Sequence, residues 1–376
     1  MKILQIIYES FGSPFGFGGA GMRAYEIFRR LKDRHDITFL CMKYPGAEDR
    51  EIEGLKHVFV GTESKNLSKS VFAYTVRAAD FVRRYGNKFD IIVENFLPAT
   101  PFFLKFFTKT PLILQIQGIM EKHSFRKFSP VYAVPMYLIE RFYFHLYDSF
   151  IFVSDITKGK VMARRRRKVK LCRVIPNGID RELLQSIPED TDYILFLSRI
   201  DTYTKGLDLL IDAFERISSE YPDMRLILAG YEFDKFEKLM SKRPSFLRKK
   251  IEYAGFVTGD EKVRLLSGAQ MFVLPSRHES SPISILEAAA CGKPVIVSDI
   301  PELAFVSQEG FGISFSSGSA NDLSEKMRLL LGDNKKREAL GKQGREFAAQ
   351  FLWDNIAVQF EDVLQHTMGN SKKCNG

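Results

Sequence analysis

Short runs of apolar, often β-branched residues alternate with longer amphipathic stretches along this chain, and the whole pattern occurs twice. This alternation is typical of βαβ units, in which a helix connects consecutive parallel strands. In the first half the expected strands are residues 2–7, 36–41, 91–94, 112–117, 149–153 and 174–175. In the second half they are residues 193–197, 225–229, 251–253, 271–274, 294–297 and 312–315. Helical spacing of apolar residues occupies 23–31, 207–219, 260–267, 285–290 and 320–331. The sequence therefore predicts an α/β protein with two doubly wound domains.

The boundary between the two domains is predicted from composition. A chain of 376 residues exceeds what one hydrophobic core usually organises. Pro, Asn, Gly and acidic residues cluster between Pro176 and Thr191. The charge balance changes sign there, since residues 1–180 hold 30 Lys and Arg against 17 Asp and Glu, whereas the remainder holds 25 against 29. We expect an N-terminal domain at 1–178, a linker, and a C-terminal domain at 191–353.

Several classes of protein are excluded by composition. No segment approaches the roughly 18 uninterrupted apolar residues of a membrane-spanning helix. The N-terminal MKILQIIYES has no small-residue cleavage site, so we expect it to be a first strand rather than an export signal. The four cysteines are far apart and form no CxxC pair, which argues against a zinc cluster or a disulfide framework. We expect a cytoplasmic protein without a bound metal.

The positive charge of the first half is concentrated in Arg164–Lys168, and a dense group of aromatic residues lies at 101–109. Basic residues interleaved with exposed aromatics can bind an anionic membrane surface, at about 1 kcal/mol per Lys or Arg near the lipid. A solvated basic loop beside a buried phenylalanine-rich helix explains the pattern equally well. Nucleic-acid binding through the same basic run is a remote alternative, because no recognition module accompanies it. We therefore expect no nucleic-acid partner, and a protein that is at most peripheral on the inner face of the membrane.

The most specific segment begins at Ser276 and reads SRHESSPISILEAAACGKPVI. It follows a buried strand and enters a helix, so free backbone amides around Ser281 to Ser284 form an anion site at the carboxyl end of the sheet. Glu279 lies in the loop and Glu287 lies eight positions later, inside the helix. Carboxylates accept hydrogen bonds from ribose or sugar hydroxyls, but they cannot hold phosphate. Taken in isolation, the two glutamates would be a helix-dipole partner and an exposed helix residue.

This segment resembles the donor-site signature of glycosyltransferase family 4, which has the GT-B fold of two Rossmann-like domains facing a central cleft. The match is the spacing from Glu279 to Glu287 followed by AAACGKPVI. Other motifs agree in order and spacing, namely NGID at 177–180, SRID at 198–201, KG at 205–206, the loop at Gly230, GFV at 255–257, PS at 275–276 and Trp353. The resemblance covers nearly the whole chain, and it is weaker in residues 40–145.

The resemblance implies a retaining glycosyltransferase that uses a UDP-, GDP- or ADP-sugar as donor and needs no further cofactor. Arg199 and Lys205 would pair with the donor diphosphate, Glu279 would contact the transferred sugar, and Glu287 would bind the ribose. Two fixed cations make a metal unnecessary for holding the diphosphate. Further donor-binding positions are Ser281, Pro282, Ile283, Ser284, Phe256, Val257 and Gly230.

In the first half, the family places a Gly-Gly pair near the acceptor and the donor phosphates, and Gly18 and Gly19 match it. After the strand that ends near 116, many relatives have a histidine where this chain has Gln117-Gly118. Glutamine donates and accepts hydrogen bonds but cannot titrate. His123, six residues further on, is either its substitute or a surface residue.

Two further acceptor-side candidates are Glu94 and Asn95, which end a predicted strand and are expected to point into the cleft. In relatives the final helix, here at about 354–368, packs back on the N-terminal domain. A glycan or lipid-linked acceptor is favoured by the basic, aromatic first domain, which suits cell-envelope glycan, lipopolysaccharide or glycolipid synthesis. A GT-B-type sugar-nucleotide epimerase and a glycoside phosphorylase stay open as alternatives. The sequence gives no indication of oligomeric state.

Overall fold

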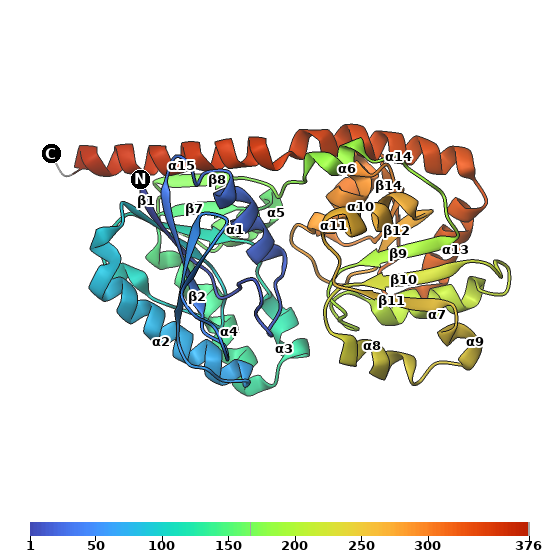
Figure 1. The fold of residues 1–376 in the computed structure, drawn as a ribbon, viewed down its shortest axis with the longest axis horizontal. Helices are drawn as coiled ribbons and strands as arrows, with labels where there is room; N and C mark the ends of the chain where they lie inside the picture. Colours follow the sequence, from blue (N-terminus) through green and yellow to red (C-terminus); the bar gives the residue numbers. More distant parts are fainter. Residues whose placement is uncertain (166, 375–376) are drawn as a thin grey trace. The chain divides into compact units, whose positions relative to one another are not determined.

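The computed structural model describes residues 1–165 and 167–374, which divide into two compact units. Unit 1 contains Met1–Asn177 together with the helix that begins at Trp353, and unit 2 contains Gly178–Leu352. Each unit is a mostly parallel sheet with helices on both of its faces (Figure 1). The predicted α/β architecture of two doubly wound domains is confirmed.

The sheet of unit 1 has the strand order β3-β4-β2-β1-β5-β6-β7-β8. Its strands are β1 (Lys2–Ile6), β2 (Asp36–Met42), β3 (Arg50–Ile52), β4 (Leu55–Val60), β5 (Ile91–Asn95), β6 (Leu112–Ile116), β7 (Ser149–Phe152) and β8 (Leu171–Val174). All neighbours are parallel except β3 and β4, which form an antiparallel hairpin. The strand order reverses direction between β1 and β5, which makes the carboxyl ends of these two strands the place where a doubly wound sheet binds ligands.

The helices of unit 1 are α1 (Gly19–Arg29), α2 (Leu67–Tyr85), α3 (Ser124–Lys127), α4 (Pro130–Phe142), α5 (Asp155–Met162) and α15 (Trp353–Cys374). The 3-10 turns that matter below are η2 (Leu104–Phe106), η3 (Glu121–His123) and η4 (Tyr143–Leu146). Helix α1 begins four residues before the predicted start at residue 23, inside the glycine-rich loop.

Helix α15 packs against α1 (Figure 1). The Phe28 and Phe360 rings meet edge to face with their centroids 5.4 Å apart. Arg30 Nε lies 2.7 Å from an Asp354 carboxylate oxygen, and His35 Nε2 lies 2.7 Å from a Glu361 oxygen. The apolar face of this last helix is therefore covered within unit 1.

A fully buried arginine joins α1 to the last residues of the first segment of unit 1. The Arg23 guanidinium donates to Ile175 O at 2.8 Å, Pro176 O at 2.5 Å and Asn177 Oδ1 at 3.1 Å. Desolvation lowers the pKa of Arg23 to about 9. These bonds fix the chain to α1 just before it leaves the unit.

The sheet of unit 2 is entirely parallel, with the order β11-β10-β9-β12-β13-β14. Its strands are β9 (Tyr193–Leu197), β10 (Arg225–Ala229), β11 (Ile251–Gly255), β12 (Met271–Leu274), β13 (Val295–Ser298) and β14 (Gly312–Phe315). Its helices are α6 (Arg181–Gln185), α7 (Leu207–Ile217), α8 (Phe233–Met240), α9 (Ser245–Arg248), α10 (Gly259–Gly268), α11 (Ile283–Ala290), α12 (Phe305–Gln308), α13 (Ala320–Leu331) and α14 (Asn334–Ala348). The reversal of strand order lies between β9 and β12.

Unit 2 begins and ends at neighbouring positions. Ile179 N donates to Phe351 O at 2.8 Å, and Ile179 forms a parallel bridge with Leu352. Residues 179–190, expected as a linker, belong to unit 2 and include α6, and Gly178, expected in the first domain, also belongs to unit 2. In the part of the chain that the structure describes, no helix combines the length and apolar character needed to cross a membrane.

Candidate donor site

The loops that follow β9 and β12 meet at the reversal point of the unit 2 sheet. Ligands of doubly wound proteins bind in the crevice outside the carboxyl ends of the strands at this point. Arg199 follows β9, and Glu279 lies in the loop that follows β12. The predicted donor-site residues therefore come from the loops that the topology singles out.

Lys205 and Glu279 form a largely buried ion pair. Lys205 Nζ lies 2.6 Å from Glu279 Oε1, and the two side chains are 16% and 7% exposed. The Ser276 hydroxyl donates to the same carboxylate oxygen at 2.7 Å. The structure thus brings together two predicted residues and adds Ser276, which belongs to the PS motif at 275–276 but was given no role in the site from the sequence.

The Lys205 loop is held against the loop after β12 by two features. Gly206 has a φ of +68°, and a Cβ there would lie 1.9 Å from Pro275 O, so only glycine permits this approach. The Arg277 guanidinium binds both Asp208 oxygens, at 2.8 and 2.6 Å, and this pairing raises the pKa of Arg277. These contacts place the Lys205 ammonium beside the Glu279 carboxylate.

Arg199 lies nearer to solvent than Lys205. Its Nη2 atom is 3.3 Å from Asp201 Oδ2, and the other Asp201 oxygen accepts from Thr204 N at 2.8 Å. Arg199 is thereby linked to the Lys205 loop, and its side chain is about half exposed. A second cation is available beside the loop without contacting Glu279.

Glu287 pairs with a different lysine, which the sequence analysis did not single out. Lys262 Nζ, from α10, lies 2.6 Å from Glu287 Oε1 on α11, and both side chains are mostly buried. The position of Lys262 in the first turn of the helix after β11 was the only sequence signal. The site therefore contains two separate lysine–carboxylate pairs.

The amino end of α11 is open to a ligand. The helix begins at Ile283 with Pro282 at the N-cap, and no side chain caps it. Residues 281–284 are all partly exposed. The first amides of a helix carry partial positive charge and can bind an anion. Ser281, Pro282, Ile283 and Ser284 thus line the helix end that the sequence predicted as an anion site.

The loops after β10 and β11 carry an aromatic pair. The Tyr231 and Phe256 rings stack with their centroids 4.0 Å apart, and Phe256 is 44% exposed. Val257 is buried, so its side chain faces the interior. Gly230 has a φ of +150°, and a Cβ there would lie 1.9 Å from Ser198 O. The exposed Phe256 ring therefore belongs to the same pair of loops as Gly230, whose backbone closely approaches that of Ser198.

In unit 1 the Glu9 carboxylate accepts hydrogen bonds from backbone amides of the glycine-rich loop. One oxygen of Glu9 accepts from Gly18 N at 2.9 Å and from Gly21 N at 2.6 Å, and Glu9 is buried. Gly18 is the N-cap of α1, and Gly19 is its first residue. The Glu9 oxygen thus lies where a phosphate oxygen would be expected to bind. The sequence analysis missed Glu9, which stands just beyond β1 at the strand-order reversal.

Two acceptor-side candidates lie together with α1. Asn95 Oδ1 accepts from Gln117 Nε2 at 2.8 Å and from Gln115 Nε2 at 3.0 Å. Gln117 Nε2 also lies 3.3 Å from Ala20 O in the first turn of α1. Gly118 follows Gln117 in a partly exposed turn, and His123 ends the short helix η3.

Glu94 does not point into a cleft, contrary to expectation. Side chains alternate along a strand, so Glu94 faces away from Asn95 into the core. Its carboxyl is fully buried and accepts from Tyr143 at 2.6 Å and from Tyr147. Desolvation raises the pKa of Glu94 to about 7, although the two tyrosine bonds oppose the rise. Glu94 is therefore out of reach of an acceptor. Among the residues that the structure describes, no group of three His, Cys, Asp or Glu side chains could hold a metal ion.

Comparison with known proteins assigns both halves of the chain. Residues 184–347 match the family model of glycosyl transferases group 1, and residues 17–183 match that of glycosyltransferase family 4. An uncharacterized glycosyltransferase of Methanocaldococcus jannaschii is 26% identical over 97% of this chain and 99% of its own length. A phosphatidyl-myo-inositol mannosyltransferase of Mycobacterium leprae is 28% identical over 53% of this chain and 54% of its own.

Solved structures show the same fold. Sucrose-phosphate synthase from Thermosynechococcus elongatus has a TM-score of 0.80 at 19% identity, covering 98% of this chain and 99% of its own. Anabaena HepE, solved with UDP-glucose, has a TM-score of 0.74 at 19% identity, covering 97% and 100%. With both units matched, the chain belongs to the family 4, group 1 glycosyltransferases and has the GT-B fold.

Proposed function

We propose that this glycosyltransferase moves a sugar from a nucleoside diphosphate sugar to an acceptor hydroxyl with retention of the anomeric configuration. The observation that supports this proposal is the buried Lys205–Glu279 pair at the reversal point of the unit 2 sheet. A diphosphate leaving group requires cations, and a sugar requires acceptors for its hydroxyls. The pair supplies one of each within 2.6 Å.

Before the donor binds, Lys205 and Glu279 neutralise each other. An arriving diphosphate would replace Glu279 as the partner of Lys205, and the freed carboxylate would accept from sugar hydroxyls. Arg199 and the amides of Ile283 and Ser284 would complete the phosphate contacts. In the proposed step the acceptor oxygen bonds to the anomeric carbon on the face that the diphosphate leaves. The bond from that carbon to the phosphate oxygen breaks, and the hydroxyl proton passes to the diphosphate.

The nucleoside would occupy the loops around α10 and α11. Glu287 would accept from the ribose hydroxyls in exchange for its bond to Lys262, and the exposed Phe256 ring would border the base. The Anabaena neighbour solved with UDP-glucose is compatible with a uridine nucleotide, and we place UDP first among the donors.

Calorimetric titration with UDP, GDP and ADP tests this donor site. We expect one nucleotide to bind at least about tenfold more tightly than the others, and Glu287→Ala to weaken it about tenfold or more through the lost ribose hydrogen bonds. The exposed Glu252, on β11, gives a matched control, since Glu252→Ala should bind as the unmodified protein does. Equal affinity of the Glu287→Ala protein, with an unchanged melting temperature, would contradict the assignment.

The need for an acceptor or for inorganic phosphate distinguishes sugar transfer from the reactions of an epimerase and a phosphorylase. Labelled donor incubated without an acceptor is converted to another nucleotide sugar only by an epimerase. A phosphorylase depends on inorganic phosphate for sugar release. For transfer, we expect product only when an acceptor hydroxyl is present and no dependence on added phosphate.

Unit 1 exposes three large apolar side chains, Phe106 in η2 and Val131 and Phe142 in α4, which we together call the α4 surface. These side chains are 69%, 77% and 61% exposed. The exposed cations Lys105 and Arg141 lie in η2 and α4 beside these residues, and the exposed Arg126 lies in α3, which contacts α4. The phenylalanine-rich segment at 101–109 is therefore not a buried helix, because Phe106 and Phe107 are exposed while Phe102 and Leu104 are buried.

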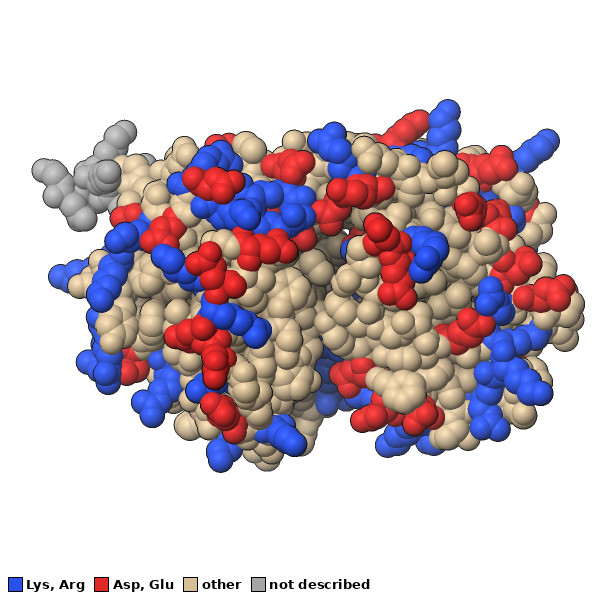
Figure 2. Space-filling view, in the orientation of Figure 1, with Lys and Arg blue, Asp and Glu red and all other residues tan. Residues whose placement is uncertain are grey.

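The basic run at 164–168 is solvated in part, because Arg167 and Lys168 are exposed whereas Arg164 and Arg165 make contacts within unit 1. Arg164 pairs with Glu121, and Arg165 lies 4.7 Å from the centre of the Phe150 ring while donating to Tyr147 O. Arg166 lies outside the described residues. On the face drawn in Figure 2, cations and carboxylates are interspersed over both units. These features favour a local lipid contact over a broad basic surface for nucleic acid.

We infer that the α4 surface rests on an anionic membrane and that the acceptor is lipid-linked. Cosedimentation with vesicles of phosphatidylcholine and phosphatidylglycerol tests the contact. Replacing Phe106, Val131 and Phe142 together by serine should reduce binding at least about tenfold, because each apolar side chain contributes about 1.5–3 kcal/mol on burial. Phe246→Ser, at an exposed phenylalanine of α9, is the matched control. Undiminished sedimentation of the triple variant would contradict the lipid contact.

A further inference from the structure

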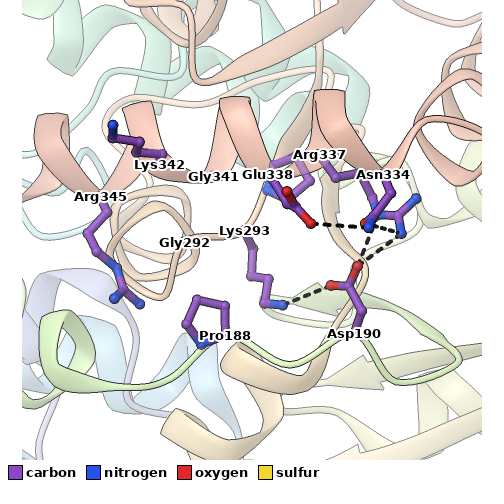
Figure 3. A pocket seen from close by; sticks show the side chains of 11 residues that line it. Pro188, Asp190, Gly292, Lys293, Asn334, Arg337, Glu338, Gly341, Lys342 and Arg345 are labelled. Carbon is purple, nitrogen blue, oxygen red and sulfur yellow. Dashed lines mark hydrogen bonds and ion pairs between the residues drawn. The ribbon is translucent and has the colours of Figure 1, made fainter.

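A cavity lies within unit 2 at the opposite end of the sheet from the donor-site loops. It has a volume of about 470 Å³ and is enclosed by residues 188–190, the turn at 292–294 after α11, and one face of α14 (Figure 3). These segments adjoin the starts of β9 and β13, whereas the donor-site loops follow the strand ends. The volume falls within the range of about 300–1,000 Å³ that is usual for small-molecule sites.

The walls of this cavity carry more positive than negative charge. The cations Lys293, Arg337, Lys342 and Arg345 face two carboxylates, Asp190 and Glu338. Asp190 is already engaged, because Lys293 Nζ lies 3.3 Å and Arg337 Nη2 lies 2.9 Å from its oxygens. Lys293 is only 2% exposed, and it also donates to Glu189 O at 2.5 Å. Lys293, Arg337 and Asp190 therefore form the structural floor of the cavity.

The positive charges of Arg345 and Lys342 are available to a ligand in the cavity. Arg345 Nη2 donates to a neutral acceptor, Ser186 O, at 2.7 Å. Its Nε atom is buried and has no hydrogen-bond partner among the described residues. Lys342 lies exposed on α14 one helical turn before Arg345 and lines the cavity rim, and Figure 3 shows its amine directed away from Arg345, so it would reach a ligand by changing its rotamer. Because Nε has no exposed surface, an anionic ligand in the cavity would have to bind the terminal Nη atoms of Arg345.

The backbone fixes the shape of the cavity. A Cβ on Gly341 would lie 2.0 Å from Gly292 O, so α14 rests directly on the turn after α11. Pro188 and Pro294 supply rigid apolar wall beside the cations. A cationic end next to an apolar wall matches a phosphate group attached to an uncharged body.

We propose that this cavity is a binding site for a phosphorylated small molecule, held through Arg345 and Lys342 and separate from the donor site. The ligand would join residues 188–190 to α14. Because it would bind the folded state alone, it would raise the melting temperature of the chain.

The test uses the full-length protein titrated with phenyl phosphate and, separately, with inorganic phosphate. The Lys342→Gln/Arg345→Gln double variant should bind phenyl phosphate about tenfold more weakly or worse, because two charge-assisted hydrogen bonds are lost. Glu338→Gln, which removes a carboxylate from the rim, should bind about two- to threefold more tightly. Lys335→Gln removes the same charge from α14 outside the cavity and should leave the affinity unchanged.

The donor site also attracts phosphate, so Lys205→Ala separates the two sites. Binding that survives Lys205→Ala and is lost with the α14 double variant supports the cavity, whether or not the donor site functions as proposed. Binding lost with Lys205→Ala, or kept by the double variant, would overturn the proposal. Weaker binding of inorganic phosphate than of phenyl phosphate would show that the ligand's body contributes, and equal binding would reduce the site to one for the free anion.

Discussion

The Lys205→Ala substitution is expected to lower kcat by about 10²–10³-fold. Lys205 is the most deeply placed cation of the proposed diphosphate site, where its side chain is 16% exposed. A fixed donor that stabilises charge on a leaving group contributes about 2.7–4 kcal/mol to catalysis. Steady-state rates at saturating donor measure this effect, because kcat should fall more than KM rises.

The unfolding temperature of the Lys205→Ala protein has to be measured beside its rate, since the substitution also deprives the buried Glu279 of its partner. Arg225 provides a control, because its pair with Glu252 is exposed on both sides and Arg225→Ala should leave the rate unchanged. Near-normal turnover of a folded Lys205→Ala protein would remove the assignment of Lys205 to the leaving group.

The buried Glu94 is expected to make unit 1 less stable as pH rises. Burial raises the pKa of Glu94 from 4.5 to about 7, so the folded state holds this proton more tightly than the unfolded state. The resulting stabilisation is fully present below pH 4.5 and is lost as pH rises through 7, a change of about 3 kcal/mol. Glu94→Gln removes the titration. The free energy of unfolding of this variant, relative to the unmodified protein, should therefore increase by about that amount between pH 4.5 and 8.

Urea denaturation at a series of pH values measures this difference. Glu63 is the control, because it is an exposed carboxyl whose hydrogen bond from Lys43 lowers its pKa. Its contribution has the opposite sign, being present above its ordinary pKa and lost as pH falls, so Glu63→Gln should gain nothing at pH 8. A difference between the Glu94→Gln and unmodified proteins that does not change with pH would show that Glu94 is charged throughout this range.

The strands were predictable where apolar runs are uninterrupted. β9, β10, β12 and β14 have the predicted bounds, and β9, β10 and β12 contain uninterrupted buried apolar runs. The hairpin β3–β4 was missed because Lys56 and His57 interrupt the apolar run of β4. The early start of α1 was missed for a different reason. Glycines are poor helix formers, and the helix begins among them where Glu9 binds their amides.

The donor site was predicted through motif spacing, and its contacts were not. Lys205 and Glu279 are 74 positions apart, and only the folded loops show that they form a pair. Lys262, Ser276 and Tyr231 were missed because their roles depend on which loops meet at the sheet edge. Glu94 was placed wrongly because the direction of a side chain at a strand end depends on register, which a single position at a strand end does not reveal.

The hydrogen bond from Ile179 N to Phe351 O suggests how the two units could be expressed as separate proteins. It places the first and last residues of unit 2 side by side, so residues 178–352 form an insertion into unit 1 with adjacent ends. Insertions of this kind can be excised, because the two ends of the inserted segment lie close together. Residues 178–352 expressed alone should fold into a nucleotide-binding module, and a short Gly-Ser bridge from Asn177 to Trp353 should close the remaining half. The proposed donor recognition and the proposed membrane contact could then be measured on two separate proteins.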